Sequence, residues 1–183
     1  MSRSAFLLMD LQLHNLAHTP ADYLPRAVTA LETARAAELP VYHVVVRLLP
    51  GHVDAHPRNK IFGALPHHLF TADDPDAAIH PDVAPREGEL VVGKNRVSAF
   101  AGNNLRQLLD ARGIEHLVLA GIATSGVVLS TALQAADLDF RVTVLSDAAS
   151  DPDPEVHTAL LTKLLPRRCE VSTTAEWAKT LGV

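Results

Sequence analysis

The chain has 183 residues, the size of one ordinary domain, and is long enough to bury an apolar core without disulfides or metal ions. Its formal charge is −5, from 16 basic and 21 acidic residues, and the absence of a basic run argues against a nucleic-acid partner. The one cysteine, Cys169, excludes an internal disulfide framework and a cysteine-based zinc cluster, and it is typical of a reducing cytoplasm. No segment predicts a membrane span or a signal peptide. We therefore expect one cytoplasmic domain over residues 1–183, without a membrane partner.

The first part of the chain predicts two buried strands joined by a helix. Residues 4–10, SAFLLMD, form a short apolar run that ends on Asp10, the pattern of a buried strand with an acid at its carboxyl end. Residues 21–38 have apolar residues at helical spacing and Pro40 beyond their end, which predicts a helix. Residues 40–49 are rich in β-branched residues and predict the second strand.

Residues 50–89 interrupt this alternation with a long irregular segment that holds many prolines and histidines. Long loops in compact domains are commonly lids or binding walls, so we expect this segment to contribute to a site. Histidines are the usual zinc ligands, but the spacing here matches no metal motif. His43 lies within the second predicted strand, and the histidines of the irregular segment are His52, His56, His67, His68 and His80. The sequence therefore predicts neither a metal ion nor a cofactor.

The remainder of the chain returns to strands that alternate with helices. Strands are predicted at residues 89–94, 116–122, 141–150 and 169–174. Helices are predicted at residues 103–112, 126–138 and 151–165, and in a final segment that contains Trp177. Because strands that alternate with helices pair in parallel through right-handed crossovers, the predicted fold class is α/β in three layers.

Residues 117–140, LVLAGIATSGVVLSTALQAADLDF, predict a strand, a turn and a helix. The turn contains Thr124 and Ser125, and either is placed to cap the helix. A turn at a helix N-terminus favours negative charge, because the free N–H groups and the helix dipole are positive there. The stretch is therefore suited to present a nucleophile or to bind an oxyanion.

Three features lie at the carboxyl ends of predicted strands. They are Asp10, Lys94 and the turn after residue 122. Ligands of an open parallel sheet bind outside the carboxyl ends of its strands, where strand order reverses. A lysine near an aspartate lowers the pKa of the carboxyl and burial raises it, so the pair can tune Asp10 as a general acid or base. Each residue alone has a plainer explanation, as a turn acceptor or a solvated strand end. Their joint placement favours a site.

Asp10 in LLMDLQ, Lys94 in VVGKNRVSAF and the turn in LVLAGIATSGVVLSTALQAAD resemble, in order and spacing, three landmarks of the isochorismatase-like family of cysteine hydrolases. The resemblance covers nearly the whole chain. It implies a six-stranded parallel sheet of order 3-2-1-4-5-6 with helices on both faces. It also implies a small-molecule substrate and assembly as a homodimer or homotetramer.

The resemblance also assigns roles to residues of the turn. Most members have the pattern G-hydrophobic-A/S-T-x-x-C, in which the cysteine attacks an amide or related carbon–nitrogen bond while aspartate acts as base and lysine assists. Gly121 begins the pattern here, and the place of the cysteine falls on Val127, which has no nucleophilic atom. The resemblance further implies a cis bond between Ile122 and Ala123, with an oxyanion hole formed by the amides of Ala123 and Val127.

No other residue has an evident claim to replace the thiol. Cys169 lies where the last strand begins, at the wrong end of the sheet, and is better explained as a small packed side chain. Ser125 in the turn and Ser130 in the helix have no identified activating partner, and a hydroxyl is harder to deprotonate than a thiol. Whether either serine substitutes for the cysteine stays open at the level of sequence.

Isochorismatases proper work without this thiol: their aspartate protonates the vinyl ether of isochorismate, and water completes the hydrolysis. Asp10 and Lys94 suffice for such chemistry. That branch of the family usually has a small residue where this chain has Val127, which leaves the substrate open.

Further pocket residues are predicted from their chemistry. Guanidinium and amide groups suit a substrate carboxylate, which points to Arg47, Arg58, Asn59 and Arg96. An apolar wall is predicted from Leu13, Phe62 and Phe100, with Thr124 and Ser125 beside it. Surface contacts and plain packing are the alternative roles. Some amidase relatives hold a metal through a D-x-H pattern, which Asp54-Ala55-His56 imitates without a second matched histidine.

The sequence thus predicts a hydrolase of this family that works by acid–base chemistry through Asp10 with Lys94. Two alternatives stay open: a non-catalytic member that binds a small molecule or a partner subunit, and a tailoring enzyme of specialised metabolism with an unusual substrate. The hydrolase is favoured because polar residues remain around the lost thiol.

Overall fold

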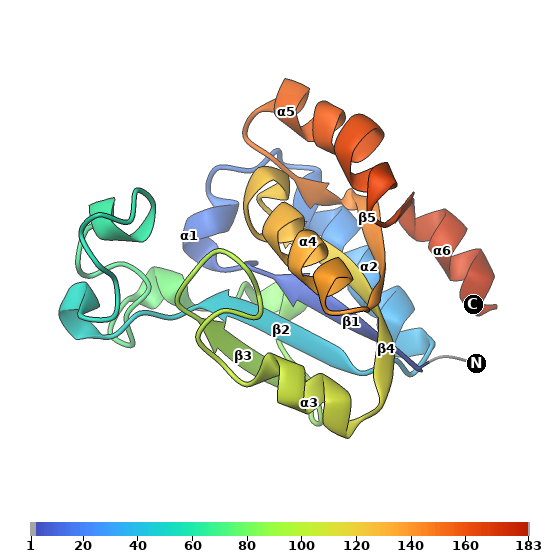
Figure 1. Ribbon diagram of the computed structural model, residues 1–183, viewed down its shortest axis with the longest axis horizontal. Coiled ribbons are helices and arrows are strands. Elements are labelled where there is room, and N and C mark those ends of the chain that lie inside the picture. The colour runs from blue at the N-terminus through green and yellow to red at the C-terminus, as the bar shows by residue number, and fades with distance from the viewer. Residues whose placement is uncertain (1–2, 183) are drawn as a thin grey trace.

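The computed structural model describes residues 3–182, which are organised around a six-stranded parallel sheet (Figure 1). The strand order is β3-β2-β1-β4-β5-β6, which confirms the predicted topology. The strands are β1 (Arg3–Met9), β2 (Val41–Val46), β3 (Leu90–Lys94), β4 (Ile114–Ile122), β5 (Arg141–Ser150) and β6 (Glu170–Ser172). The order reverses between β1 and β4, so the carboxyl ends of these two strands mark the switch point at which such sheets bind ligands.

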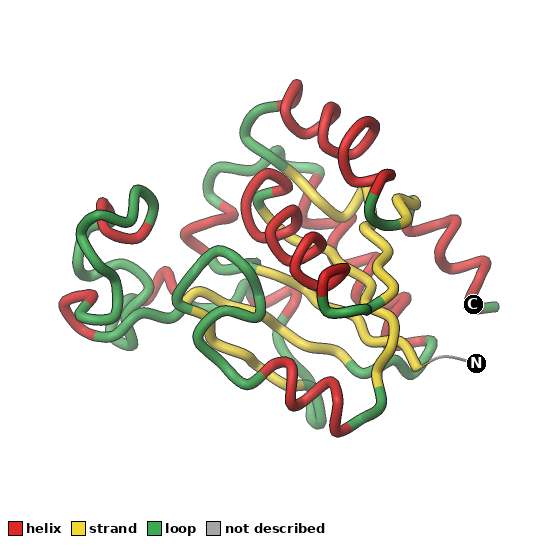
Figure 2. Tube along the Cα trace, viewed as in Figure 1, coloured by secondary structure: helices red, strands yellow, loops and turns green. Residues whose placement is uncertain are grey.

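Helices cover both faces of the sheet, as the α/β prediction requires (Figures 1 and 2). The helices are α1 (Leu13–Leu16), α2 (Tyr23–Ala36), α3 (Leu105–Ala111), α4 (Leu129–Asp137), α5 (Pro154–Ala159) and α6 (Thr174–Leu181). The helix predicted over residues 151–165 is divided, because α5 passes into a π turn at Leu160–Leu164 and a 3-10 turn at Leu165–Arg167. None of the helices within residues 3–182 has the length and apolar character needed to cross a membrane.

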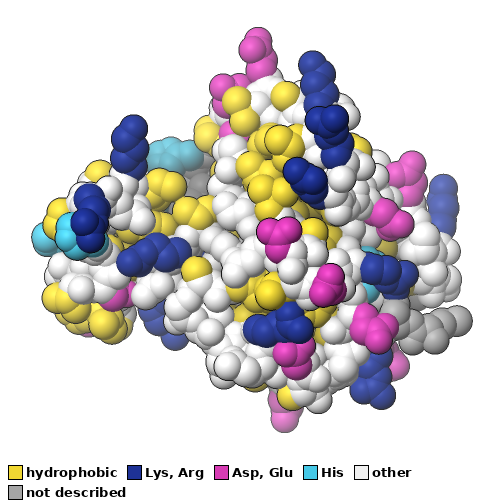
Figure 3. Space-filling view, in the orientation of Figure 1, with side chains coloured by type: hydrophobic (Ala, Val, Ile, Leu, Met, Phe, Trp, Pro, Cys, Tyr) yellow, Lys and Arg dark blue, Asp and Glu magenta, His cyan; other side chains and the backbone are white. Residues whose placement is uncertain are grey.

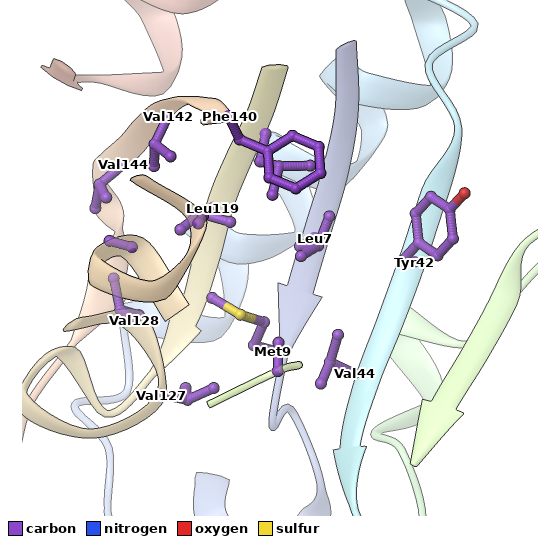
Figure 4. Close-up of a cluster of buried hydrophobic side chains, with 14 of the residues drawn as sticks. Leu7, Met9, Tyr42, Val44, Leu119, Val127, Val128, Phe140, Val142 and Val144 are labelled. Atoms are coloured by element: carbon purple, nitrogen blue, oxygen red, sulfur yellow. The ribbon is translucent and has the colours of Figure 1, made fainter. Parts of the chain in front are cut away.

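Two apolar clusters lie on the two faces of the sheet. One joins α2 and α6 to the strands, and in it the rings of Phe6 and Trp177 stack with centroids 5.7 Å apart. The other lies under α3 and α4 and includes Met9 and Val127 (Figure 4). The central strands β1 and β4 feed both clusters, because successive side chains of a strand point to opposite faces. This explains why their sequences are continuously apolar.

Between β2 and β3 the chain leaves the sheet and forms a projection, seen at the left of Figure 1. We call residues 49–69 the lobe. A hydrogen bond from the Leu48 N–H to the Phe70 carbonyl, 2.9 Å long, closes its neck. A third apolar cluster, which includes Val46 and Phe62, packs the lobe against the end of β2. The predicted irregular segment therefore stands at the carboxyl edge of the sheet.

Candidate active site

Asp10 directly follows β1, and its backbone is held on both sides. Its N–H donates to the Val44 carbonyl (2.8 Å), and its own carbonyl accepts from Asn15 Nδ2 (3.0 Å). Its φ of 64° lies in the left-handed region, which aspartate tolerates better than most residues. These contacts fix the direction of the carboxylate at the carboxyl end of the sheet.

The carboxylate of Asp10 forms a buried ion pair with Lys94, the last residue of β3. Lys94 Nζ lies 2.9 Å from Asp10 Oδ2, and the exposed fractions of the two side chains are 1% and 8%. Lys94 Nζ also donates to the Arg96 carbonyl at 3.2 Å. Asp10 Oδ1, by contrast, is buried and has no hydrogen-bond partner among the described residues. Because a buried polar atom without a partner is costly, this oxygen is suited to meet a ligand.

The environment of Asp10 perturbs the ionisation of its carboxyl. Burial raises the pKa of the Asp10 carboxyl above its ordinary value, and the charge and hydrogen bond of Lys94 oppose this rise without cancelling it. A raised pKa moves a carboxyl toward neutral pH, where general acids and bases work best. The geometry and the electrostatics of Asp10 therefore both suit proton transfer.

The turn after β4 brings the backbone of that strand against Asp10. The Ile122–Ala123 peptide bond is cis, at the position that the resemblance implies. Gly121 has a φ of 147°, and a Cβ there would collide with the Met9 carbonyl oxygen, so only glycine allows β1 and β4 to approach this closely. A π turn at Thr124–Val128 then precedes α4.

Thr124 and Ser125 do not cap α4 with their side chains, which corrects the prediction. The π turn shifts the start of the helix to Leu129, so both residues lie a turn too early. Thr124 Oγ1 is instead hydrogen-bonded to His157 Nδ1 (2.8 Å), and the Ser125 N–H donates to Asp151 Oδ2 (2.7 Å). The two contacts tie the turn to the segment after β5.

A cavity of about 270 Å³ opens beside the ion pair. Its wall is mainly apolar and is contributed by Asp10 after β1, by α1, by the ends of β2, β3 and β4, by the lobe and Phe70 beside it, and by the loops after β3 and β4. The lining residues are Asp10, His14, Asn15, Val46, Ile61, Phe62, Leu65, Phe70, Lys94, Val97, Ile122, Ala123, Gly126 and Val127. A second cavity, of about 180 Å³, shares His14, Asn15, Ile122 and Ala123 with it and extends toward Asp151.

Val127 belongs both to the core and to the cavity wall. It is 2% exposed and packs in the apolar cluster that contains Met9, Val44 and Val128 (Figure 4). The cavity remains open with this side chain in place. Val127 therefore shapes the site without filling it.

The structure brings some of the predicted pocket residues together and separates others. Those in the cavity wall are Asp10, Lys94, Phe62, Ile122, Ala123 and Val127. Those outside it are Leu13, Arg47, Arg58, Asn59, Arg96, Phe100, Thr124 and Ser125. Within residues 3–182 no serine, threonine or cysteine lines the wall, and Ser130 lies outside it, within α4.

Local contacts explain why several predicted residues lie elsewhere. Arg96 donates from Nη2 to the Asp54 carbonyl at 2.9 Å, so its guanidinium is held by the lobe. Asn59 Oδ1 accepts the N–H groups of Ile61 and Phe62, both at 3.0 Å. The Phe100 ring stacks on another ring, that of Phe140, with centroids 6.1 Å apart.

Asp54 and Cys169 have local structural contacts of this kind. Asp54 Oδ1 accepts from the Leu49 N–H and Oδ2 from Asn95 Nδ2, both at 3.2 Å. Within residues 3–182 no three side chains of the metal-binding types are grouped to hold an ion. Burial raises the pKa of the Cys169 thiol to about 11, and its Sγ donates to the Leu165 carbonyl at 3.3 Å. Cys169 also lies at the start of β6, away from the carboxyl ends that carry the cavity.

The wall residues that sequence reasoning missed are His14, Asn15, Val46, Ile61, Leu65, Phe70, Val97 and Gly126. His14 and Asn15 carried a usable signal, because they follow a strand-end aspartate by about one helical turn. Phe70 and Val97 lie in irregular segments, where no periodicity indicates the direction of a side chain.

The chain is similar to known proteins in sequence and in structure. The isochorismatase domain model matches residues 4–176. The secreted isochorismatase effector Isc1 of Verticillium dahliae is 34% identical over 141 residues, which cover 76% of this chain and 66% of that protein. A probable inactive nicotinamidase of Arabidopsis thaliana is 34% identical over 97 residues, 52% of this chain and 50% of that protein. The chain thus spans about half to two thirds of the length of these curated relatives.

A solved structure agrees over a longer stretch. An isochorismatase family protein from Burkholderia thailandensis superposes with a TM-score of 0.85 at 30% identity, and the match covers 98% of this chain and 96% of that one. The family match includes Asp10, Lys94 and the turn that leads to Val127. The chain therefore belongs to the isochorismatase family.

Proposed function

We propose that this protein is an isochorismatase-family hydrolase that acts on a small molecule by acid–base chemistry through Asp10 and Lys94, without a nucleophilic thiol. The observation that carries the proposal is the buried Asp10–Lys94 pair, 2.9 Å apart, in the wall of an open cavity. Lys94 engages one carboxyl oxygen of Asp10, and the other has no partner among residues 3–182. One oxygen is therefore left for proton exchange with a substrate.

In the proposed reaction the protonated Asp10 gives its proton to the substrate, for example to the terminal carbon of a vinyl ether. The carbon that bears the ether oxygen becomes cationic, and a water molecule adds to it while its surplus proton returns to Asp10. The resulting hemiketal divides into an alcohol and a ketone, so one water is consumed and Asp10 is regenerated. Lys94 stabilises the carboxylate that exists between the two proton transfers.

A covalent route lacks a nucleophile in this cavity. The position that carries cysteine in most members is Val127, and no serine, threonine or cysteine lines the wall. Ser125, the nearest hydroxyl in the turn by sequence, is exposed and outside the wall. Proton transfer through Asp10 is the chemistry that the wall residues support.

The test is turnover of a panel of vinyl ethers, amides and hydantoin-like rings by the wild type and by Asp10→Asn. Loss of a general acid typically lowers the rate by about 10²–10⁴-fold, and we expect kcat to fall by at least that lower factor. Ser125→Ala, outside the cavity wall, is the matched control and should retain activity. Unchanged turnover by Asp10→Asn of any substrate that the wild type hydrolyses would contradict the mechanism.

A non-catalytic member that binds a small molecule or a partner subunit is the second candidate. It is favoured by the packing of Val127 into the core and by the likeness to a relative described as probably inactive. Ligand binding without turnover across the same panel supports this candidate, and any turnover that depends on Asp10 excludes it. A tailoring enzyme of specialised metabolism would use the same pocket, so only its substrate would distinguish it.

Location and assembly are also part of the proposal. A cytoplasmic protein is supported by the single cysteine, and a homodimer or homotetramer by the family resemblance. Fractionation of the native host and light scattering of the purified protein test the two points.

A further inference from the structure

We infer that the ligand of the Asp10 cavity is uncharged and compact, a largely apolar ring or vinyl ether without a carboxylate or phosphate group. The inference names the substrate class of the site and so rests on the function proposed above. It replaces the carboxylate that the arginines of the sequence suggested.

The wall of the cavity is balanced in charge. Among residues 3–182, Asp10 and Lys94 are the only acidic or basic side chains in it apart from His14, and they neutralise each other in a pair. His14 packs edge-on against the Phe70 ring, with centroids 5.1 Å apart. Most of the remaining wall consists of aliphatic and aromatic side chains. An anion that entered would lose its hydration and meet a cation that is already paired.

The arginines near the cavity lie outside its wall. Arg96 donates to the carbonyls of Asn95 and Asp54, which holds its guanidinium against the lobe. Arg47 is exposed and lines a different hollow, beside Asp54 and Asn95. Arg58 is exposed, and Figure 3 shows basic side chains on the outer surface of the projecting region. None of the three arginines is part of the cavity wall.

The volume of the cavity and the polarity of its wall both limit the ligand. An apolar cavity of about 150 Å³ holds a benzene molecule, so about 270 Å³ accommodates a ring with a short substituent. Asp10 Oδ1 is the buried wall atom that lacks a protein partner among residues 3–182, and it offers one hydrogen bond to such a substituent. A neutral polar group on an apolar ring satisfies both features.

The experiment compares neutral and anionic ligands of the same shape. Benzamide and benzoate, with nicotinamide and nicotinate as a second pair, are titrated calorimetrically into the wild-type protein at pH 7.5. We expect the carboxamide to bind at least tenfold more tightly than the carboxylate in each pair whose amide binds. A carboxylate that binds as tightly as its amide, or failure of both amides to bind at 10 mM, overturns the inference.

Two variants test the cause of the preference. Asp10→Asn leaves Lys94 without its anion, and we expect benzoate affinity to rise at least tenfold. Val97→Arg adds a cation to the wall and should act in the same direction, whereas Val97→Met, of comparable length without charge, should leave the amide-to-carboxylate ratio within threefold. A ratio that neither Asp10→Asn nor Val97→Arg changes contradicts the charge argument, provided circular dichroism shows that both variants fold.

These outcomes are separable from those of the proposed function. A neutral preference without any Asp10-dependent turnover keeps the inference about the ligand and removes the hydrolase. Asp10-dependent turnover of a carboxylate substrate, with no preference for amides in binding, keeps the hydrolase and removes the inference.

Discussion

Two carboxylates lie at opposite ends of the sheet, the buried Asp10 after β1 and the partly buried Glu89 before β3. Their surroundings have opposite effects on them. Glu89 accepts from Arg35 Nε at 2.7 Å and from Arg35 Nη2 at 2.8 Å, and is also hydrogen-bonded to His43 Nε2 at 2.8 Å and the Arg86 N–H at 2.9 Å. Burial alone would raise the pKa of Glu89, but these hydrogen bonds hold it at about 2. Asp10 has one side-chain partner, Lys94, and its pKa is raised.

The difference distinguishes the Arg35–Glu89 pair, which has a structural role, from the Lys94–Asp10 pair, which is suited to proton transfer. A carboxylate whose oxygens are saturated by fixed donors stays ionised and has no capacity left for a ligand. A carboxylate with one oxygen unpartnered beside a cavity can exchange a proton with whatever enters. A perturbed pKa alone does not identify a site. The direction of the pKa shift, together with an oxygen that has no partner, distinguishes Asp10 from Glu89.

Removing the cation from each pair gives the largest expected contrast in activity. Lys94→Met should lower turnover by about 10²-fold or more, because the carboxylate of Asp10 loses its stabilising charge. The pKa of Asp10 should rise further, since the charge of Lys94 lowers it, and the ionisation seen in the pH–rate profile should move to higher pH. Arg35→Met, at the other pair, should retain turnover within about threefold at temperatures where it is folded. Equal losses of turnover in both variants would erase the functional distinction.

The contrast should reverse for stability. Arg35→Met leaves the partly buried Glu89 without its bidentate partner, and the loss of hydrogen bonds to a charged group costs about 1.5–3 kcal/mol. Lys94→Met should cost less, because the raised pKa of Asp10 lets that carboxyl become neutral. Urea denaturation at pH 7 measures both free energies of unfolding. A larger loss for Lys94→Met than for Arg35→Met contradicts this assignment.

The two carboxylates should act on stability with opposite pH dependence. The folded pKa of Glu89, about 2, lies below its ordinary value of 4.5, so its contribution is complete above pH 4.5 and is lost as pH falls toward 2. The folded pKa of Asp10 lies above its ordinary 3.8, so its contribution is present below pH 3.8 and is lost as pH rises through the folded value. Glu89→Gln should flatten the acid-side loss of stability, by at most about 1.4 kcal/mol per pH unit. Urea denaturation from pH 2.5 to 8 tests the sign, and Asp10→Asn should change the slope in the opposite sense.

The smallest effect is expected for an exposed pair near Glu89. Arg86 Nη2 lies 2.8 Å from Glu32 Oε1, and both side chains are about half exposed. Arg86→Ala keeps the backbone N–H that reaches Glu89 and should change the free energy of unfolding by less than about 1 kcal/mol. A loss comparable with that of Arg35→Met would show that the exposed Arg86–Glu32 pair stabilises the fold as much as the Arg35–Glu89 pair does.

Much of the fold could be predicted because its strands are buried on both faces. The runs FLLM before Asp10 and LVLAGI before residue 123 are continuously apolar, which is typical of central parallel strands. The order of the strands was predicted from the family resemblance, because no local sequence pattern indicates which distant strands pair. The division of the helix after Pro154 and the π turn before Leu129 were not predictable from helical spacing alone.

The candidate site was predictable at the strand ends and not beyond them. Strand ends are ordered by the sheet, so Asp10 and Lys94 could be placed from the topology. The direction of a loop side chain depends on its hydrogen bonds, as Arg96 shows: its guanidinium is held by the Asp54 carbonyl instead of facing the cavity. Phe70 lines the wall from an irregular segment that no spacing rule describes, whereas His14 and Asn15 follow Asp10 by about one helical turn and carried a usable signal.

The closed neck of the lobe has a consequence for how a ligand is held. Ile61, Phe62 and Leu65 contribute to the cavity wall from the lobe, whereas Asp10 and Lys94 contribute from the sheet. A bound molecule would therefore contact both the lobe and the strand ends that carry Asp10 and Lys94. The lobe is closed at its neck by one hydrogen bond and is packed by a small apolar cluster. Local opening of such a segment requires less free energy than global unfolding. Ligand binding should slow amide hydrogen exchange more in the lobe than in β1 or β4.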